Sequence, residues 1–328
     1  MNKIRSKYNL KTIQISYNMQ ILSIFIFIVI LVIYIYIMDQ YKTAKDIEIY
    51  EMDYIDNAHL QEVCQLRQPI LFQFLPVDPI FMLYQGSDAE VNVKDTDKYY
   101  SQKIVDIDPV VVSYDCAKQL FSNDENSHFF SEDNSEFLET TRLLKHIENY
   151  NKLLAPSYYT IHTEYDFLFG SPNTTTPLRY HMYYRRFLYV LSGKIQVKMT
   201  SWKSIDTIHD YENYDFRSPV SPETVFQNKK IKFMDIEVLN GLILYIPPYM
   251  WYSIKYVDTD SRILSISHTT AMNAISNAHH IGLYWLQQHN IVKVPTNNKE
   301  LDKELDKEIE QSIEIDEHEI DLSSNSIQ

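Results

Sequence analysis

The side chains best suited to chemistry lie in the C-terminal half of the chain. One stretch carries five basic or imidazole side chains: Arg179, His181, Arg185, Arg186 and Lys194. Guanidinium and ammonium groups form charge-assisted hydrogen bonds with carboxylates and phosphates. Imidazole and carboxylate groups, which are ligand types for first-row metal ions, lie near this stretch in the sequence. They belong to His162, Glu164, Asp166 and His268. These residue types offer either anion binding or metal binding.

The segment after Pro156 must position these side chains, and its pattern is that of β-structure. Short runs of β-branched and aromatic residues alternate with polar turns, which predicts strands. The predicted strands are Tyr159–Ile161, Phe187–Leu191, Ile195–Met199, Leu242–Ile246, Trp251–Val257 and Ile263–Ser267. Their spacing favours an antiparallel barrel or a double-sheet jelly roll.

Helices are predicted on both sides of this β-region. Apolar residues at helical spacing indicate helices at 57–66, 115–121, 135–154 and 272–289. Residues 202–232 form a long polar insertion between strands. The order of helices, strands and a closing helix predicts the α+β class with a β core.

Two parts of the β-region resemble a known family. The first runs from Thr176–His181 to Ser192–Lys194, and the second is Tyr245–Tyr252, which contains Ile-Pro-Pro-Tyr-Met-Trp. With the upstream run Arg67–Phe72, these segments are similar to JmjC/cupin-like hydroxylases, the family related to the asparaginyl hydroxylase that inhibits hypoxia-inducible factor. The similarity covers roughly residues 55–290. It implies a double-stranded β-helix, the cupin jelly-roll barrel, with flanking helices.

The resemblance also implies a metal site, but the ligand positions are changed. In this family two histidines and one carboxylate hold Fe(II) and leave positions open for 2-oxoglutarate and O₂. An ungapped alignment places these ligands on Arg179, His181 and Tyr252. A guanidinium is permanently charged and cannot ligate a cation. We therefore expect a domain without metal or cofactor.

An alternative keeps the Fe(II)/2-oxoglutarate dioxygenase and moves its ligands. It requires His181, one of His162 and His268, and a carboxylate such as Asp166 to converge on one point. Glu164 lies in the same stretch as Asp166 and is a further candidate carboxylate.

Without a metal, the same region is predicted to form a binding pocket. The candidate pocket residues are Arg179, His181, Lys194, Trp251 and Tyr252. Lys194 falls at the position of the 2-oxoglutarate-binding lysine of the resembled family. Tyr252 is expected to line the barrel with its hydroxyl hydrogen-bonded. Arg185 and Arg186 are expected to end at the barrel rim, solvated or in salt bridges.

The N-terminal region contains an apolar run that is long enough to span a membrane. Ile21–Met38 has no charged residue, and at 1.5 Å per residue a helix of this length just crosses a hydrocarbon core. No site of small residues for signal cleavage follows it, so an uncleaved single-pass anchor is favoured. Residues 1–20 carry basic and no acidic side chains, whereas acids predominate after the run. The positive-inside rule thus predicts a cytoplasmic N-terminus and a lumenal or external domain.

Composition divides the rest of the chain into a stalk (39–54), a folded domain (55–290) and an acidic tail (291–328). The chain has a formal net charge of −14. Lys299–Gln328 contains eleven acidic residues, three lysines and no aromatic residue, so the tail is expected to be disordered. Nothing in the domain is basic enough to indicate nucleic-acid binding.

Three further features bear on partners and modification. Cys64 and Cys116 are interpreted as two buried thiols, with one disulfide as the alternative. Asn173 begins the Asn-Thr-Thr tripeptide and is a candidate for glycosylation. The closing helix, 272–289, is a candidate homodimer contact, since related domains often pair through C-terminal helices.

Three functions follow from these observations. The first is a membrane-anchored, non-catalytic cupin-like domain, a pseudoenzyme that binds a protein partner, a glycan or a small anion. The second is the Fe(II)/2-oxoglutarate-dependent protein hydroxylase with relocated ligands. The third is a structural membrane protein in which the domain builds an assembly.

Overall fold

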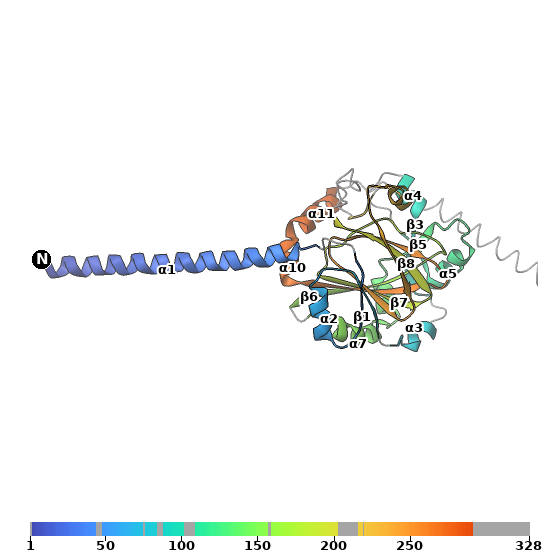
Figure 1. Ribbon diagram of the computed structural model, residues 1–328, viewed down its shortest axis with the longest axis horizontal. Helices are drawn as coiled ribbons and strands as arrows, with labels where there is room; N and C mark the ends of the chain where they lie inside the picture. Colours follow the sequence, from blue (N-terminus) through green and yellow to red (C-terminus); the bar gives the residue numbers. More distant parts are fainter. Residues whose placement is uncertain are drawn as a thin grey trace, which may run out of the picture.

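The computed structural model describes residues 2–43, 48–74, 76–83, 88–101, 109–156, 159–202, 216–218 and 220–290. One long N-terminal helix projects from an α+β domain that is built on a large mixed sheet and a smaller antiparallel sheet (Figure 1). The predicted acidic tail and residues 203–215 and 219 of the predicted insertion lie outside the described residues.

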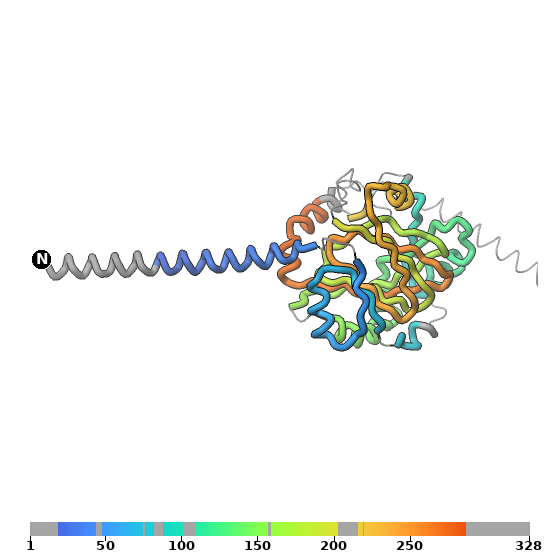
Figure 2. Tube along the Cα trace, in the orientation of Figure 1, coloured from blue at the N-terminus to red at the C-terminus, as the bar shows by residue number. Residues whose placement is uncertain are grey.

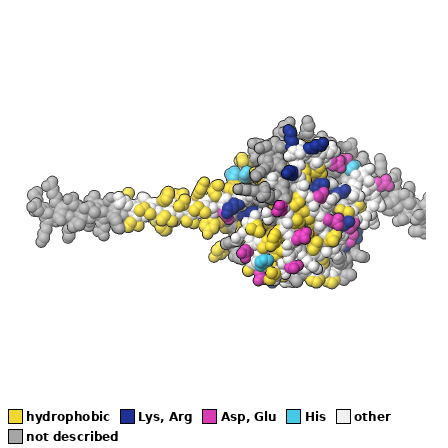
Figure 3. Space-filling view, viewed as in Figure 1, with side chains coloured by type: hydrophobic (Ala, Val, Ile, Leu, Met, Phe, Trp, Pro, Cys, Tyr) yellow, Lys and Arg dark blue, Asp and Glu magenta, His cyan; other side chains and the backbone are white. Residues whose placement is uncertain are grey.

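The N-terminal helix, α1, spans Asn2–Gln40 and contains the apolar run. The most apolar 18-residue window of its segment Met19–Gln40 has a mean hydropathy of 3.1, and none of that window is buried inside the molecule. Apolar side chains cover this part of the helix surface (Figure 3). Such a helix is compatible with a single-pass membrane anchor or with a signal sequence.

Within the described residues, the larger sheet has nine strands in the order β1-β2-β10-β7-β12-β6-β5-β3-β4. In that order they are Tyr50–Asp53, Ile70–Gln73, Leu242–Ile246, Arg185–Ser192, Arg262–Thr270, Thr160–Gly170, Phe129–Ser131, Glu90–Asp95 and Val110–Ser113. Strands β1 and β2 are parallel and the other neighbours are antiparallel, so the sheet is mixed. The central strands β7 and β12 are buried on both faces along most of their length, as strands between two covering layers must be.

A second sheet packs on one face of the first. Its described strands are β11 (Trp251–Tyr256), β8 (Lys194–Thr200) and β9 (Met234–Leu239), in that order. Apolar side chains of both sheets form a shared core, including Leu188 and Val190 from β7 and Val197 and Ile254 from the smaller sheet. Because side chains alternate along a strand, every second residue of β8 enters this core.

Helices cover the opposite face of the large sheet. The covering helices are α2 (Asn57–Cys64), α5 (Tyr114–Asn123), α6 (Ser135–Thr140) and α7 (Leu144–Leu154). Their apolar side chains pack with those of β2, β6, β7, β10 and β12 in a second core. Shorter helices complete the domain: α3 (Pro79–Leu83), α4 (Thr96–Ser101) and α9 (Pro222–Phe226). The tube in Figure 2 shows how the chain winds through these layers.

The structure confirms the predicted β-character after Pro156 and corrects several bounds. The predicted strand Leu242–Ile246 is β10, whereas the predicted strand Tyr159–Ile161 is too short because β6 runs from Thr160 to Gly170. The predicted helix 135–154 is interrupted between α6 and α7. Arg142 has a φ of 60° there, a left-handed conformation that a continuous α-helix excludes.

The predicted closing helix, 272–289, is divided into α10 (Ala271–Ser276) and α11 (Ala278–Asn290). Helix α10 packs against the end of α1, and both lie at the end of the domain that α1 enters (Figure 1). Within the predicted stalk, Tyr50–Asp53 forms β1, so these four residues belong to the sheet. They depart from the predicted stalk because their backbone groups pair with those of β2.

Both cysteines are free thiols. Cys64 is buried, and its burial raises the pKa of the thiol to about 11. Cys116 is only partly buried. The structure therefore confirms two unpaired thiols but not the burial of both.

Candidate functional site

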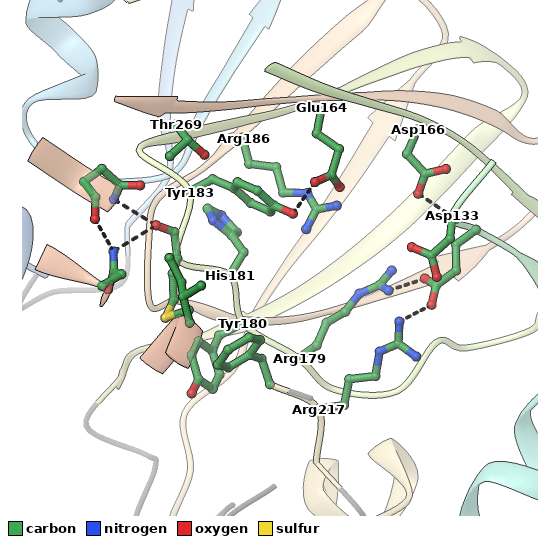
Figure 4. Close-up of a pocket in the computed structure, with 16 residues that line it drawn as sticks. Asp133, Glu164, Asp166, Arg179, Tyr180, His181, Tyr183, Arg186, Arg217 and Thr269 are labelled. Atoms are coloured by element: carbon green, nitrogen blue, oxygen red, sulfur yellow. Dashed lines mark hydrogen bonds and ion pairs between the residues drawn. The ribbon is translucent and has the colours of Figure 1, made fainter. Parts of the chain in front are cut away.

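A cavity of about 280 Å³, with several charged residues in its lining, opens beside the inner face of the large sheet. Its walls come from the turn after β5, from β6 and β7, from the segment 179–183, and from α10 and α11. Charged side chains from these elements point toward one another in it (Figure 4). The sequence brings them together because the strands of the sheet carry alternate side chains to the same face.

Glu132 is the buried anion of this cavity, with a side chain that is 1% exposed. Arg179 and Arg217 each donate a hydrogen bond to its carboxylate, and the Lys94 ammonium lies 3.0 Å from Oε1. Burial alone raises the pKa of Glu132, but the three cations outweigh burial and hold the pKa well below its usual value. Glu132 therefore stays ionised and neutralises part of a strongly cationic cluster.

Arg179 is fixed both by its backbone and by its side chain. Its backbone exchanges two hydrogen bonds with Tyr252, at 2.9 and 2.7 Å. Its guanidinium lies 5.5 Å from the centre of the Tyr252 ring, a cation–π contact. Arg179 is 7% exposed, and its Nε has no hydrogen-bond partner among the described residues.

His181 is a buried neutral imidazole. It is 3% exposed, and its Nε2 lies 3.0 Å from the carbonyl oxygen of Ile246, which assigns the ring proton to Nε2. Burial, followed by the nearby charge of Arg186, lowers the pKa of His181 well below its usual value. Within the described part of the chain Nδ1 has no partner. The unpaired Nδ1 of His181 is thus buried beside the cavity.

Arg186 also lines the cavity. Its Nε donates to the Ser265 hydroxyl at 3.2 Å, and its guanidinium lies 5.4 Å from the centre of the Tyr183 ring. Tyr183 in turn donates its hydroxyl proton to Glu164 at 2.6 Å (Figure 4). Arg186 forms no ion pair with a carboxylate among the described residues, so its outer N–H groups are free to bind a ligand.

The predicted rim location is wrong for both arginines of β7. Arg186 faces the cavity, and Arg185 is completely buried on the opposite face of the sheet. The Arg185 guanidinium contacts the Cys64 carbonyl and the Tyr245 hydroxyl, both at 3.2 Å, and lies 4.3 Å from the centre of the Tyr184 ring. Strand alternation sends the two neighbours to opposite faces.

The structure brings together only part of the predicted pocket. Arg179 and His181 line the cavity, and Tyr252 packs against both of them inside the core between the sheets. Lys194 lies elsewhere, at the start of β8, with its ammonium 3.9 Å from Glu237. Trp251 is buried in a separate cluster, where it stacks on Trp202. Asn173 is exposed in a turn, as an acceptor for glycosylation would have to be.

The relocated metal ligands do not converge among the described residues. His268 lies on the helix-covered face, with Nε2 2.6 Å from Asn151 of α7, whereas His181 packs near Tyr252 on the other face. His162 is exposed on β6. Asp166 accepts hydrogen bonds from the backbone of Asp133 and Asn134. No group of three or more His, Cys, Asp or Glu side chains in the described ranges is placed to hold a metal.

Glu132, Arg217 and Lys94 are the site residues that the sequence does not reveal. Glu132 lies in a polar stretch that reads as a loop, 38, 47 and 85 positions from its three cationic partners. A single acid in such a stretch is normally solvated, and no spacing rule links it to partners so far away. The one available signal is the run Phe129–Ser131 just before it, a short apolar strand that would carry Glu132 inward.

The arrangement presents polar groups that can bind a ligand. It combines a guanidinium with free donors, a neutral imidazole with a free acceptor, and a tyrosine hydroxyl that is already hydrogen-bonded. Comparison of the chain with protein-family models and with curated proteins finds no match.

Proposed function

We propose that this protein is a membrane-anchored, cupin-like binding domain whose cavity takes a small anionic ligand without a metal. The ligand class is a carboxylate or a phosphate. The observation that carries this proposal is Arg186, a guanidinium in the cavity wall with no carboxylate partner among the described residues. Such a group binds carboxylate or phosphate oxygens through two parallel hydrogen bonds.

The other walls of the cavity fit a small ligand that also carries a hydrogen-bond donor. The volume of about 280 Å³ lies near the lower end of ligand-binding pockets, roughly 300–1,000 Å³. Arg186 would hold the anionic group of the ligand, and Nδ1 of His181 would accept a hydrogen bond from a hydroxyl or amine on it. These roles require a charged Arg186 and a neutral His181, which are the protonation states that the site maintains.

A cupin-like barrel that has lost its metal site accounts for the position of Arg179. Two facing sheets with a shared core and helices on the outer face support the double-stranded β-helix as the finer description of the fold. In that comparison Arg179 stands at the first metal-ligand position. Its guanidinium is paired with Glu132 and places positive charge where Fe(II) would bind. The residues present therefore do not fit Fe(II).

Helix α1 supports the membrane location. The domain would be held at the bilayer by residues 21–38, with the N-terminus in the cytoplasm and the domain on the lumenal or external side. A ligand-binding domain in this position would sense or retain a small anion in that compartment.

Thermal unfolding of the full chain in maltoside micelles tests the proposed ligand. Malonate, acetate and inorganic phosphate would each be titrated in the presence of EDTA. We expect at least one anion to raise the unfolding midpoint, since a ligand at ten times its Kd stabilises the folded state by about 1.4 kcal/mol.

Three variants make this test specific. Arg186→Gln removes the charge and should abolish the shift, and Arg186→Lys keeps the charge but loses the planar fork, so it should retain a weaker shift. Arg142→Gln alters an exposed arginine outside the cavity and should behave as the wild type. An unchanged shift in Arg186→Gln, or no shift with any anion, would refute the proposed ligand class.

A further inference from the structure

A second cavity lies where α1 meets the domain. It has a volume of about 340 Å³, and its lining includes Tyr36, Gln40 and Lys42 from the N-terminal region and Arg67 and Tyr184 from the domain. None of these residues lines the cavity described above. The inference drawn from this cavity depends on the membrane anchor of the proposed function.

Arg67 is a buried cation in this cavity that pairs with no described carboxylate, because Asp39, which also lines the cavity, is paired with Lys42. It is 5% exposed, and its Nη1 lies 3.5 Å from the Tyr184 carbonyl oxygen, a weak contact at the limit of hydrogen bonding. The guanidinium also lies 5.1 Å from the centre of the Tyr184 ring. Arg67 makes no ion pair with any described carboxylate. A buried guanidinium that lacks a counter-charge is costly unless a ligand supplies one.

Gln40 adds an unused polar group to the same cavity. It is the last residue of α1 and is 6% exposed, and its Oε1 has no hydrogen-bond partner in the described part of the chain. Lys42, by contrast, is exposed and paired with Asp39 at 2.6 Å. The cavity therefore contains a guanidinium that forms no ion pair and an acceptor, Gln40 Oε1, that has no hydrogen-bond partner among the described residues.

The end of α1 is attached to the domain, so this cavity has a defined height relative to α1. The Tyr41 hydroxyl donates to the Ser276 carbonyl, and the Tyr41 and Tyr249 rings are 5.9 Å apart. The apolar run ends at Met38, and Asp39 is the first charged residue after it. If α1 spans a bilayer, Gln40 and Arg67 lie at the level of the lipid headgroups.

The same end of the domain exposes apolar side chains. Ile281 and Trp285 of α11 are 48% and 57% exposed, and α11 lies next to the point where α1 enters the domain (Figure 1). Tryptophan is enriched at membrane–water interfaces because its ring is apolar and its N–H is polar. This surface agrees with a domain that rests against the bilayer.

We propose that the cavity binds the phosphate of a membrane phospholipid, with Arg67 on the phosphate oxygens and Gln40 accepting a hydrogen bond from a headgroup hydroxyl or amine. Free inorganic phosphate offers the same phosphate chemistry to Arg67 from solution. The lipid is favoured because the cavity adjoins the anchor at headgroup height. A bound lipid would lock the angle between α1 and the domain.

The test uses the full chain in maltoside micelles, with the thermal unfolding midpoint as the readout. Dihexanoyl phosphatidylglycerol is titrated below its micellar concentration, and inorganic phosphate is titrated in parallel. The lipid is expected to raise the midpoint in the wild type. Arg67→Gln should weaken the apparent affinity roughly tenfold or more, because it removes the charge-assisted contact.

Two further variants keep the test decisive. Gln40→Leu leaves the cation in place and should weaken the lipid affinity by a smaller factor, and it replaces Arg67→Gln if that variant does not fold. Arg142→Gln is the matched control, because Arg142 has a φ of 60° as Arg67 has 58°, but is exposed and lies outside both cavities.

The possible outcomes separate the two ligands and the two proposals. Equal stabilisation by inorganic phosphate and by the lipid would overturn the lipid assignment, and wild-type lipid affinity in Arg67→Gln and Gln40→Leu would overturn the site. Arg186→Gln should keep the lipid response, so a failed anion site and a failed lipid site are distinguishable. Retention of the chain in the membrane pellet after alkaline carbonate washing tests the anchor separately.

Discussion

Arg185 and Arg186 are neighbours in sequence with opposite surroundings. Arg185 is fully buried on the helix-covered face, where carbonyl, amide and hydroxyl groups surround its guanidinium. Arg186 faces the cavity, where a serine hydroxyl and a tyrosine ring are its neighbours and its outer N–H groups have no partner among the described residues. The guanidinium of Arg185 is hydrogen-bonded within the fold, whereas the guanidinium of Arg186 can still contact a ligand.

This contrast shows how one strand can serve both stability and binding. Alternate side chains of β7 enter two different layers, so a single strand contributes to the helix-covered core and to the cavity wall. Variants on the helix-covered face should change stability, and variants on the cavity face should change binding. The cluster around Glu132 is the exception on the cavity face, because its charges are buried and paired.

The largest effect is expected for Glu132→Gln, which tests that exception. The substitution leaves Arg179, Arg217 and Lys94 close together without their shared anion. Removing one partner of a buried ion pair lowers the free energy of unfolding by roughly 3–5 kcal/mol. Urea unfolding of the full chain in maltoside micelles measures the change.

The matched control for this prediction is Glu125→Gln, because Glu125 is exposed. Its effect should stay within about 0.5 kcal/mol. A loss of less than about 1 kcal/mol in Glu132→Gln would show that the cation cluster does not depend on Glu132.

Acid titration tests the helix-covered face through His268. Burial, followed by the charge of Arg185, lowers the pKa of His268 to about 4, below the unfolded value of about 6.5. The unfolded state thus binds more protons in this interval, and stability rises with pH. The contribution of His268 is complete above pH 6.5 and is lost as the pH falls toward 4.

His268→Gln removes this titration and leaves the other groups in place. Between pH 7 and pH 4 the wild type should lose about 3 kcal/mol more unfolding free energy than the variant. Parallel curves for the two proteins across this interval would mean that His268 is already solvated in the folded state.

Substituting each arginine in turn tests directly whether Arg185 serves stability and Arg186 serves binding. Arg185→Ala leaves the Gln61 side chain, the Cys64 carbonyl and the Tyr245 hydroxyl without their donor, and should cost about 2–3 kcal/mol of stability. Arg186→Ala should cost less than about 1 kcal/mol, because its group is half-buried and largely unpaired. Anion binding should show the reverse order. Equal stability losses in the two variants would contradict the division of roles.

The smallest effect is expected at Lys194, which the family resemblance places at the ligand. Its ammonium is 3.9 Å from Glu237, and both side chains are more than one third exposed. Lys194→Gln should therefore change stability by less than about 0.5 kcal/mol and leave anion affinity unchanged. A tenfold loss of anion affinity would place Lys194 in the binding site and contradict binding of the anion in the cavity beside Arg186.

The β-region was accessible to sequence reasoning because its signals are local. The strand 242–246 alternates with turns and contains no breaker, so its bounds agree with the structure. β6 is longer than predicted because it also contains the charged residues Glu164 and Asp166, which lie on its cavity face and do not fit the β-branched and aromatic pattern of a strand. The sequence pattern does not indicate β3 for the same reason, since its six residues include Glu90, Lys94 and Asp95.

The candidate site was only partly accessible. Arg179 and His181 carry a motif resemblance, and both line the cavity. Arg186 was placed at the rim because the pattern of a strand does not say which face of it opens to a cavity. Glu132 is recognisable only from three partners that are distant in sequence, and such pairing depends on the tertiary fold.

The most direct test of the account is the metal dependence of anion binding. Isothermal titration of malonate, inorganic phosphate and 2-oxoglutarate into the full chain would be compared with EDTA and with stoichiometric Fe(II) under anaerobic conditions. The account predicts binding of at least one anion with the same Kd in both conditions, and no binding of it to Arg186→Gln. Binding that appears only with Fe(II), and only for 2-oxoglutarate, would contradict it and restore the hydroxylase.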